Sequence, residues 1–461
     1  MELKLNAQKE AALKRVADAV LREVKPSAAE ARELTVKINA VMGRLKKVVP
    51  KNVEIMVAGS AARGTNLKGN SDIDIFLLFS NPVPKSKMES VAIDVAKKMV
   101  KGKKNESYIV RYAEHPYARL FLDGVGLRVD LVPAYKIASV KDKITSVDRT
   151  QLHNEFVKSA LSQRQQDDVR VLKALLKAHV IYGAEAKIEG FSGYLCELLT
   201  YSYGSFSKLL VGMANAKPPV VINLSDGQHD PAKLVKVFGK KLIVIDPTDE
   251  DRNVAANVSD ESFARFALLC RVLLMWPTEK NFRGVGYSDV NSKAKLSAIS
   301  KKLGVGLYAV SFQVDDISDE VIWQQLKKMM ISASVALSKL GFAPLISLQE
   351  VDGTAAVMGF MINESRKSYK VVVGPSALMR DASEAFMLAH GKSVIFRSIE
   401  SDRLYVVEEA ECTTPEEALR YVLKEMAMPS HFKKSFKVYI NNVPEAQAKL
   451  LYRAYFRKTN L

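Results

Sequence analysis

Three aspartates in two predicted strands carry the most informative chemistry of the sequence. Asp72 and Asp74 open a strand predicted over 72–79, and side chains two residues apart in a strand leave the same face. Two like charges this close are costly unless a cation lies between them. Hard oxygen ligands favour Mg²⁺, which adds substrate phosphates to its shell. Asp130, in a strand predicted over 127–132, offers a third carboxylate to hold a second metal or activate a hydroxyl, so the set predicts phosphoryl transfer.

A glycine turn precedes the first two aspartates. The strand predicted over 53–57 closes at Gly59, and a helix is expected to open at Ser60. A glycine at this place lets phosphate oxygens approach backbone N–H groups, and the Ser60 hydroxyl and the Arg63 guanidinium are further donors. There is no G-x-x-x-x-G-K-[ST] run here, which excludes a P-loop NTPase. A Gly-Ser turn by itself usually has no function beyond reversing the chain. It favours a nucleotide site here because the aspartates follow it in the chain.

Composition narrows the class of protein. The chain has 461 residues, too many for one compact core, and its formal charge of +17 indicates a polyanionic partner; a charged surface kept for solubility is the alternative. Three cysteines lie far apart, which fits a reducing cytosol and excludes a disulfide framework or a zinc pattern. The first residues lack a signal-peptide core, and the most apolar stretch, 263–276, is too short to cross a bilayer. We expect a cytoplasmic protein without a membrane partner.

Hydrophobic periodicity predicts an α/β plus α multidomain protein in three parts. Residues 1–145 form a mixed α/β head that begins with two helices, 146–275 form a mainly helical middle, and 276–461 form an α+β region. A helix is expected over 86–100 and a buried helix over 263–276. The remaining expected strands are 108–112, 118–122, 241–245 (a lone strand), 351–362, 370–373, 394–397 and 404–408.

The order of the motifs resembles a known family. Gly59-Ser60, Asp72-x-Asp74 and a later strand Asp130 look like the signature of the polymerase-beta-type nucleotidyltransferase superfamily, and the match is closer still to its archaeal class I CCA-adding enzymes. Six separate segments between about residue 40 and residue 275 occur in the family's order. Besides the signature itself, these are Arg111–Tyr117, Ser146–His153, Ile181–Glu185, Gly190–Leu199 and Asp246–Asn257.

The resemblance implies template-independent addition of C, C and A to tRNA 3′ ends from CTP and ATP, with Mg²⁺ and release of pyrophosphate. Asp72 and Asp74 would bind the metals, and Asp130 would complete that set beside the primer 3′-hydroxyl. The positions that match nucleotide-binding residues of the family are Gly59, Ser60, Arg63, Thr150, His153, Lys173 and Tyr182. Without the resemblance, we would interpret His153 as a histidine at a helix start that hydrogen-bonds to the backbone. Lys173 would be interpreted as a residue on a solvated helix face, and Tyr182 as a packing residue.

Arg252 is the residue that the resemblance assigns to base selection. A site that accepts CTP and ATP but not UTP or GTP must meet the Watson–Crick edge with fixed partners, because a wrong base then leaves buried groups unpaired. A planar guanidinium suits that task. We expect Arg252 in a loop between a strand and a helix. An ion pair with Asp246, Asp249 or Asp251 is the structural alternative, and both can hold.

The C-terminal segment 431–461 is strongly basic, with seven Lys or Arg residues against one acid, Glu445. Basic side chains follow phosphates, whereas the interleaved aromatic residues are expected to pack. The resemblance implies that this region holds the tRNA acceptor stem and T-arm by shape, and that the protein forms a homodimer through it. The candidate RNA contacts are Lys433, Lys434, Lys437, Arg453, Arg457 and Lys458.

Two other functions fit part of the pattern. A poly(A) polymerase or an oligoadenylate synthetase-like enzyme would share the head, but the Arg252 segment and the basic tail favour tRNA. A catalytically inactive RNA-binding protein with the same fold is the second alternative. The presence of all three carboxylates, Asp72, Asp74 and Asp130, argues against that reading.

Overall fold

The computed structural model describes residues 5–70, 72–80, 83–112, 116–227, 229–284, 288–365, 369–390 and 394–459. The chain forms two compact units, one that runs to residue 286 and one that spans 287–459. The nucleotidyltransferase-type head, helical middle and antiparallel α+β C-terminal region expected from the sequence are confirmed as the fold class. The two domain boundaries predicted at residues 145 and 275 stay predictions.

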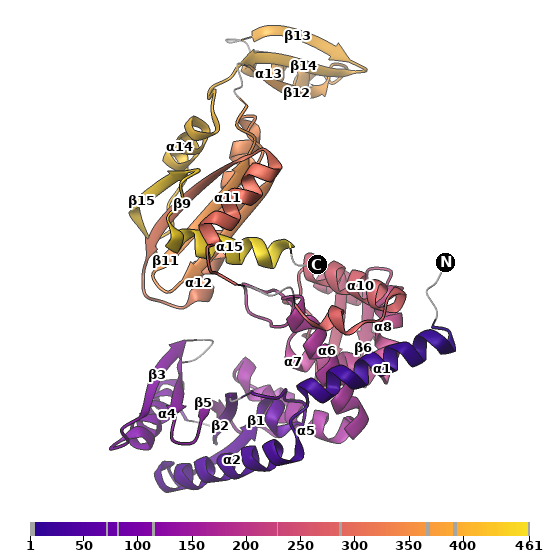
Figure 1. The fold of residues 1–461 in the computed structure, drawn as a ribbon, viewed down its shortest axis with the longest axis vertical. Helices are drawn as coiled ribbons and strands as arrows, with labels where there is room; N and C mark the ends of the chain where they lie inside the picture. Colours follow the sequence, from indigo (N-terminus) through magenta and orange to yellow (C-terminus); the bar gives the residue numbers. More distant parts are fainter. Residues whose placement is uncertain are drawn as a thin grey trace. The chain divides into compact units, whose positions relative to one another are not determined.

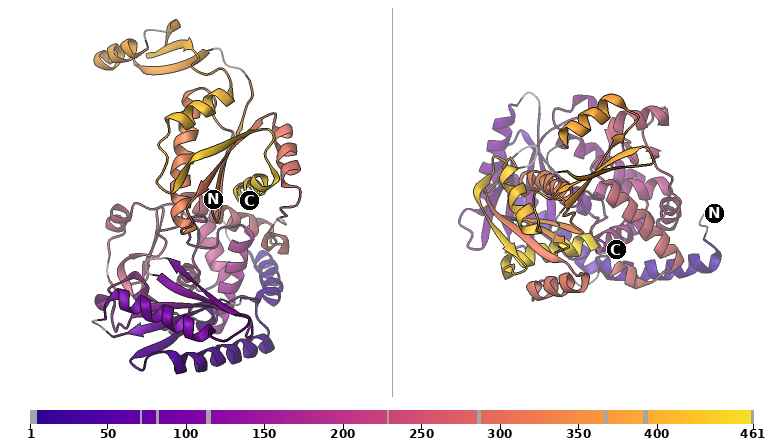
Figure 2. Two further views of the ribbon diagram at one scale, coloured as in Figure 1. Left: turned by 90° about the vertical axis from the view of Figure 1, so that its left-hand side faces the viewer. Right: turned by 90° about the horizontal axis from the view of Figure 1, so that it is seen from above.

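The head is built on a five-stranded sheet with the order β1-β2-β5-β4-β3. β2 and β5 run parallel, and the other neighbouring strands are antiparallel. Helices α2 and α4 cover one face, where Ile73 and Ile75 pack with Val41, Leu45 and Val95 (Figures 1 and 2). The elements are α2 (Ala28–Val48), β1 (Val53–Ala58), α3 (Gly59–Ala62), β2 (Asp72–Phe79), α4 (Lys85–Val100), β3 (Glu106–Tyr112), β4 (Pro116–Leu122) and β5 (Leu127–Tyr135).

The rest of the first unit is mainly helical, around a core that includes Leu172, Leu198 and Phe266, and it also contains a small sheet. The first helix, α1 (Ala7–Val24), joins this core through Leu13. The prediction of a lone strand over 241–245 is wrong, because β7 lies between β6 and β8 in a three-stranded sheet. The further elements are η1 (Val140–Asp142), η2 (Ser146–Arg149), α5 (Thr150–Ala160), α6 (Gln163–Ala178), α7 (Gly193–Tyr203), α8 (Phe206–Ala214), β6 (Val220–Asn223), α9 (Pro231–Phe238), β7 (Leu242–Asp246), β8 (Asp249–Asn253), α10 (Asp260–Met275) and η3 (Glu279–Phe282).

The apolar stretch over 263–276 is α10, and both of its arginines have partners. Arg265 pairs with Glu261 at 3.0 Å, and the Nε of Arg271 donates to the carbonyl of Ala214 at 2.8 Å. The helix predicted over 263–276 is therefore present, but it is buried on one side only, because Leu268, Met275 and Trp276 are exposed. Within the described ranges no helix has the length and apolarity that a membrane crossing requires. The three cysteines are free thiols, and all of them are buried.

The second unit contains two antiparallel sheets. The larger one has the order β10-β11-β9-β15, and α11 and α15 cover one of its faces through Leu296, Leu307 and Leu451. The smaller one, β12-β14-β13, carries α13 against β12. The elements are α11 (Ser292–Leu303), β9 (Gly306–Val314), α12 (Asp319–Lys339), β10 (Ile346–Asp352), β11 (Ala355–Ile362), β12 (Tyr369–Ser376), α13 (Arg380–Ala389), β13 (Val394–Glu400), β14 (Arg403–Glu409), α14 (Pro415–Glu425), β15 (Phe432–Ile440) and α15 (Glu445–Thr459).

The strand predicted over 351–362 is a hairpin in the structure. β10 ends at Asp352, Gly353 takes a φ of +55°, and β11 begins at Ala355. The Asp-Gly pair supplies the positive φ that a tight hairpin turn requires, so the chain reverses at this point. The prediction of one continuous strand is therefore wrong.

Candidate active site

The parallel pairing of β2 with β5 brings the three predicted carboxylates onto one face of the head sheet. Asp74 lies directly opposite Asp130 in the register, and Asp72 lies two residues away on the same strand. Residue partners on neighbouring strands are about 4.8 Å apart. Ile73 between the two aspartates is buried on the other face, as the alternation predicts. Sequence reasoning thus placed the aspartates on one face correctly.

Basic side chains contact two of these carboxylates. Arg119 on β4 donates from two nitrogens to the two oxygens of Asp130, each at 2.7 Å. Arg128 lies 2.8 Å from Asp72, whose side chain is well exposed. Arg119 was not predicted, although the apolar residues Ala118 and Leu120 on either side of it indicate that Arg119 points to the opposite face of the strand, where Asp130 lies.

Burial raises the pKa of Asp74, and the charges of Asp130 and Asp72 raise it further, while Arg63 opposes them. A nearby cation relieves this cost, because it favours the ionised form. No group of three His, Cys, Asp or Glu side chains converges on a metal-sized point within the described ranges. Asp72 and Asp74 nevertheless fit Mg²⁺, which needs only one or two carboxylates when substrate phosphates complete its shell.

Gly59 holds the turn against Asp74. Its φ is +74°, and a Cβ built on it would lie 2.2 Å from Oδ2 of Asp74. Only glycine combines this backbone angle with so close an approach. Ser60 follows, half-buried, on the four-residue helix α3. The turn predicted from the sequence is therefore also a packing surface for the second aspartate.

A buried ionic cluster joins this turn to the helical part of the unit. Arg63 lies 2.9 Å from Glu197 of α7, which is 0% exposed. Thr65 donates its hydroxyl to the same carboxylate, and Nζ of Lys173 lies 3.1 Å from Oγ1 of Thr65 and 3.6 Å from Glu197. Lys173 is 1% exposed, and burial lowers its pKa. The predicted contact of Lys173 with the nucleotide stays a prediction, since the ammonium points into this cluster. The part played by Glu197 was not predicted from the sequence.

His153 and Arg252 meet at a second buried carboxylate, Asp246. Nε2 of His153 and Nη1 of Arg252 lie 2.9 Å and 2.6 Å from Oδ2 of Asp246. The His153 ring stacks on Tyr194, with 4.1 Å between centroids and 22° between planes. Burial lowers the pKa of His153 despite the neighbouring Asp246. The predicted ion pair of Arg252 is present, but Arg252 lies on strand β8 and not in the predicted loop, because β8 folds back onto β7.

Two other predicted positions lie in the same unit. Thr150 is half-buried at the beginning of α5, just after Asp148, whose buried carboxylate accepts from the backbone N–H groups of Tyr135 and Thr145 at 2.8 Å and 2.7 Å. Tyr182 is half-buried, and Nζ of Lys177 lies 5.3 Å from its ring centroid. Their nucleotide contacts stay predictions. Residues 113–115 of the Arg111–Tyr117 segment lie outside the described residues.

The basic residues of the C-terminal segment fall into two groups. Lys433, Lys434 and Lys437 are exposed on the edge strand β15, and Lys433 lies 2.6 Å from Asp315. The three on α15 contact β10 of their own unit: Arg457 lies 2.9 Å from Glu350, Arg453 lies 3.4 Å from Asp352, and Lys458 donates to Ser347. The structure therefore separates an exposed group of lysines from a group that anchors a helix.

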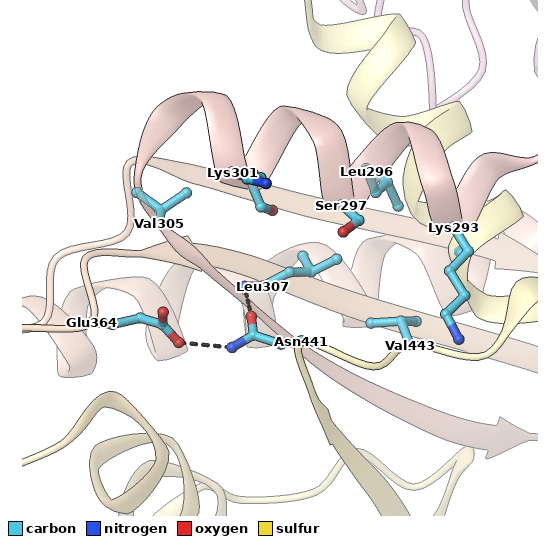
Figure 3. Close-up of a pocket in the computed structure, with 11 residues that line it drawn as sticks. Lys293, Leu296, Ser297, Lys301, Val305, Leu307, Glu364, Asn441 and Val443 are labelled. Atoms are coloured by element: carbon cyan, nitrogen blue, oxygen red, sulfur yellow. Dashed lines mark hydrogen bonds between the residues drawn. The ribbon is translucent and has the colours of Figure 1, made fainter.

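The turn between β15 and α15 is held by side-chain contacts. Asn441 has a φ of +56°, and its Oδ1 accepts from the backbone N–H of Leu307 at 2.8 Å. Its Nδ2 donates to Glu364 at 2.7 Å, as Figure 3 shows beside a cavity of about 190 Å³. These contacts fix the end of the strand that carries the exposed lysines.

Three family models match the chain in sequence. They are described as a nucleotidyltransferase domain (residues 38–153), a tRNA nucleotidyltransferase second domain (167–283) and a CCA-adding enzyme C-terminal domain (303–441). The first two cover the carboxylates and the Asp246 site. The fold and the matching models thus define a nucleotidyltransferase.

Curated relatives extend the match over most of the chain. The CCA-adding enzyme of Methanocaldococcus jannaschii is 35% identical over 82% of this chain and 84% of its own, and that of Archaeoglobus fulgidus is 34% identical over 80% of each. A solved structure of the Cid1 poly(U) polymerase has a TM-score of 0.48 at 16% identity, over 61% of this chain and 100% of its own. The chain belongs to the archaeal-type CCA-adding enzymes, as the resemblance implied. It is a CCA tRNA nucleotidyltransferase, which adds CCA to the tRNA 3′ end.

Proposed function

We propose that the nucleotidyl transfer takes place at Asp72, Asp74 and Asp130, with Mg²⁺ as the metal. The observation that carries this proposal is the register of β2 with β5, which sets Asp74 opposite Asp130. The pKa of Asp74 is raised by burial and then by its neighbouring carboxylate, so a cation beside it is favoured. When bound, Mg²⁺ supplies positive charge to the triphosphate and the leaving group.

The chain's own residues position the reaction. The primer 3′-oxygen attacks the α-phosphate of the nucleotide in line, a new P–O bond forms, and the bond to pyrophosphate breaks. Asp130 lies beside the 3′-hydroxyl and favours loss of its proton, and Arg119 holds both oxygens of Asp130. No covalent intermediate on the protein is needed, because positioning and charge neutralisation lower the barrier.

The incoming nucleotide is held by residues on both sides of the carboxylates. Gly59, Ser60 and Arg63 bind the triphosphate, and Thr150, His153 and Tyr182 bind the triphosphate or the ribose. In the described conformation Lys173 acts on the nucleotide through Glu197 and Arg63, since its Nζ lies inside that cluster. Arg252 presents donors to the edges of cytosine and adenine.

The tRNA is bound along its acceptor stem and T-arm by the C-terminal region. The exposed lysines of β15 support this, because exposed cations on an edge strand can follow the phosphates of an A-form helix. Arg453, Arg457 and Lys458 contribute by anchoring α15, which their contacts with β10 support.

The protein forms a homodimer through the same C-terminal region, and it is cytoplasmic. Large apolar side chains on the small β12-β14-β13 sheet support the dimer: Tyr369, Val371 and Phe396 are each more than half exposed. Apolar area of this kind on a soluble domain usually marks a contact surface. The buried free thiols support a reducing compartment.

The proposed site is tested with Asp74→Asn, compared with Asp249→Asn. Asp249 is buried, is ion-paired to Lys143 and Arg149, and lies outside the set of three carboxylates, so it serves as the control. We expect Asp74→Asn to lose at least about a hundredfold in incorporation of CTP onto a tRNA transcript that lacks CCA, while tRNA binding persists. Incorporation near the rate of Asp249→Asn would contradict the assignment.

The same variant tests the electrostatics of Asp74. Its folded pKa is raised, so the ionised side chain lowers the stability of the fold at neutral pH. This cost begins to fall as the pH drops through the folded pKa, and it is gone below the ordinary pKa of an aspartate. We therefore expect Asp74→Asn to have a higher free energy of unfolding than the wild type at pH 7 without metal. Chemical denaturation measures this difference, and a lower free energy of unfolding would contradict the assigned environment.

A further inference from the structure

Asp246 is the last residue of β7 and is 0% exposed, although every neighbour in its strand is apolar. Oδ1 of Asp246 accepts from the hydroxyl of Tyr194 at 3.0 Å and from the backbone N–H and hydroxyl of Thr248 at 2.9 Å and 2.8 Å. Oδ2 accepts from Arg252 at 2.6 Å and lies 2.9 Å from Nε2 of His153. A carboxylate this buried persists only when its oxygens have such partners.

Besides Thr248 in the turn that follows β7, the partners of Asp246 come from three separate segments. His153 belongs to α5, Tyr194 to α7 and Arg252 to β8. The three also contact one another, because His153 stacks on Tyr194 and the guanidinium of Arg252 lies 6.0 Å from the same ring. One buried anion therefore fixes the relative positions of a helix start, a second helix and a strand.

Asp246 stays ionised. Burial alone would raise the pKa of Asp246, but its contacts with His153, Thr248 and Arg252 outweigh burial and hold the pKa well below its usual range. The hydrogen bond from Arg252 uses one of the five N–H groups of the guanidinium, so the others remain available to a base edge. Their direction is then set by the carboxylate, because the guanidinium is planar.

We propose that Asp246 is a positioning residue that determines nucleotide specificity, because it holds Arg252 in the orientation that reads cytosine and adenine and couples Arg252 to His153. This inference rests on the role proposed above for Arg252. The fixed orientation matters because discrimination depends on donors that cannot turn to suit a wrong base. A guanidinium released from Asp246 can rotate to meet the edge of uracil.

The test is a double-mutant cycle between Asp246→Asn and Arg252→Ala. Asp246→Asn keeps the volume but removes the charge that holds the guanidinium. The quantity measured is the ratio of kcat/KM for CTP to kcat/KM for UTP on a tRNA transcript that lacks CCA. We expect Asp246→Asn to lower this ratio by about tenfold or more, and to lower it no further when Arg252 is already alanine.

Asp249→Asn is the matched control, since it removes a buried, ion-paired carboxylate in the neighbouring strand. We expect Asp249→Asn to leave the ratio of kcat/KM for CTP to kcat/KM for UTP unchanged. The control therefore distinguishes a general destabilisation of the β7–β8 hairpin from loss of the contact between Asp246 and Arg252. If Asp246→Asn does not fold, Tyr194→Phe gives a second test, because it removes one hydrogen bond to Oδ1 and keeps the ring. A smaller fall of the ratio in the same direction is expected.

Failure of the inference differs from failure of the role of Arg252. If Arg252→Ala relaxes the CTP-to-UTP ratio while a folded Asp246→Asn keeps the ratio of the control, Asp246 does not position Arg252 and the inference is overturned alone. If Arg252→Ala itself leaves the ratio unchanged, the base-reading role is wrong and the inference falls with it. If the two substitutions lower the CTP-to-UTP ratio independently, so that their effects multiply in the double variant, the inference about Asp246 is also overturned.

Discussion

Replacement of Gly59 by alanine separates the geometry of the carboxylates from the stability of the fold. The new Cβ would lie 2.2 Å from Oδ2 of Asp74, and ordinary contact begins near 3.4 Å, so the carboxylate has to retreat by about 1.2 Å. A carboxylate is the end of a flexible side chain, so this movement costs the fold little. A displacement of about 1 Å in a catalytic group nevertheless costs on the order of a hundredfold in rate.

The backbone effect of the same change is calculable separately. A non-glycine residue at a positive φ costs about 1–2 kcal/mol of stability. Gly102, between α4 and β3, offers a matched control, because its φ is +72° and a Cβ on it meets nothing within 4 Å. Gly102→Ala therefore carries the backbone strain of Gly59→Ala without the contact with Asp74.

The assay is single-turnover addition of CTP to a tRNA transcript that lacks CCA, together with chemical denaturation of both variants. We expect both to lose about 1–2 kcal/mol of stability. Only Gly59→Ala is expected to lose about a hundredfold in rate, with tRNA affinity unchanged. If Gly59→Ala turns over as fast as Gly102→Ala, the contact between the turn and Asp74 has no part in the chemistry.

Two further predictions concern charge. Arg63 opposes the effects of burial and of neighbouring carboxylates on the pKa of Asp74, so Arg63→Ala is expected to raise that pKa further. The acid limb of the profile of kcat/KM against pH then moves to higher pH, and an acid limb that does not move would contradict the placement of Arg63. Alanine at all three exposed lysines of β15 should lower the slope of log affinity for tRNA against log salt by about one per lysine. The same change at Lys97 and Lys98 of α4 and at Lys101, which follows the helix, removes equal charge and serves as the control. An equal loss of slope in the control would show that the β15 lysines have no special role in tRNA binding.

The positions of site residues could be predicted where polar and apolar residues alternate along a single strand. Asp72 and Asp74 follow a period of two against buried isoleucines, which alone places them on one face. The pairing of Asp74 with Asp130 is not encoded locally, because a parallel pair is joined through a distant crossover. Arg119 was accessible to the same alternation argument and was overlooked.

The residues that join segments were the hardest to predict. Glu197 lies in an apolar helix, and nothing near it in sequence indicates Arg63 or Lys173 as partners. β8 is polar and reads as a loop, yet the side chain of Asn253 accepts from the backbone N–H of Val244 and secures it against β7. The hairpin at Gly353 carried the usual Asp-Gly signal, but the apolar run over 355–362 that follows it favoured a single strand.

The most direct test of the central claim is addition of labelled CTP and ATP, separately and together, to a tRNA transcript that lacks its CCA end, with Mg²⁺. We expect two C residues with CTP alone, and a single A after them only when both nucleotides are present. A long A tail, or tRNA binding without any incorporation by the intact chain, would contradict it.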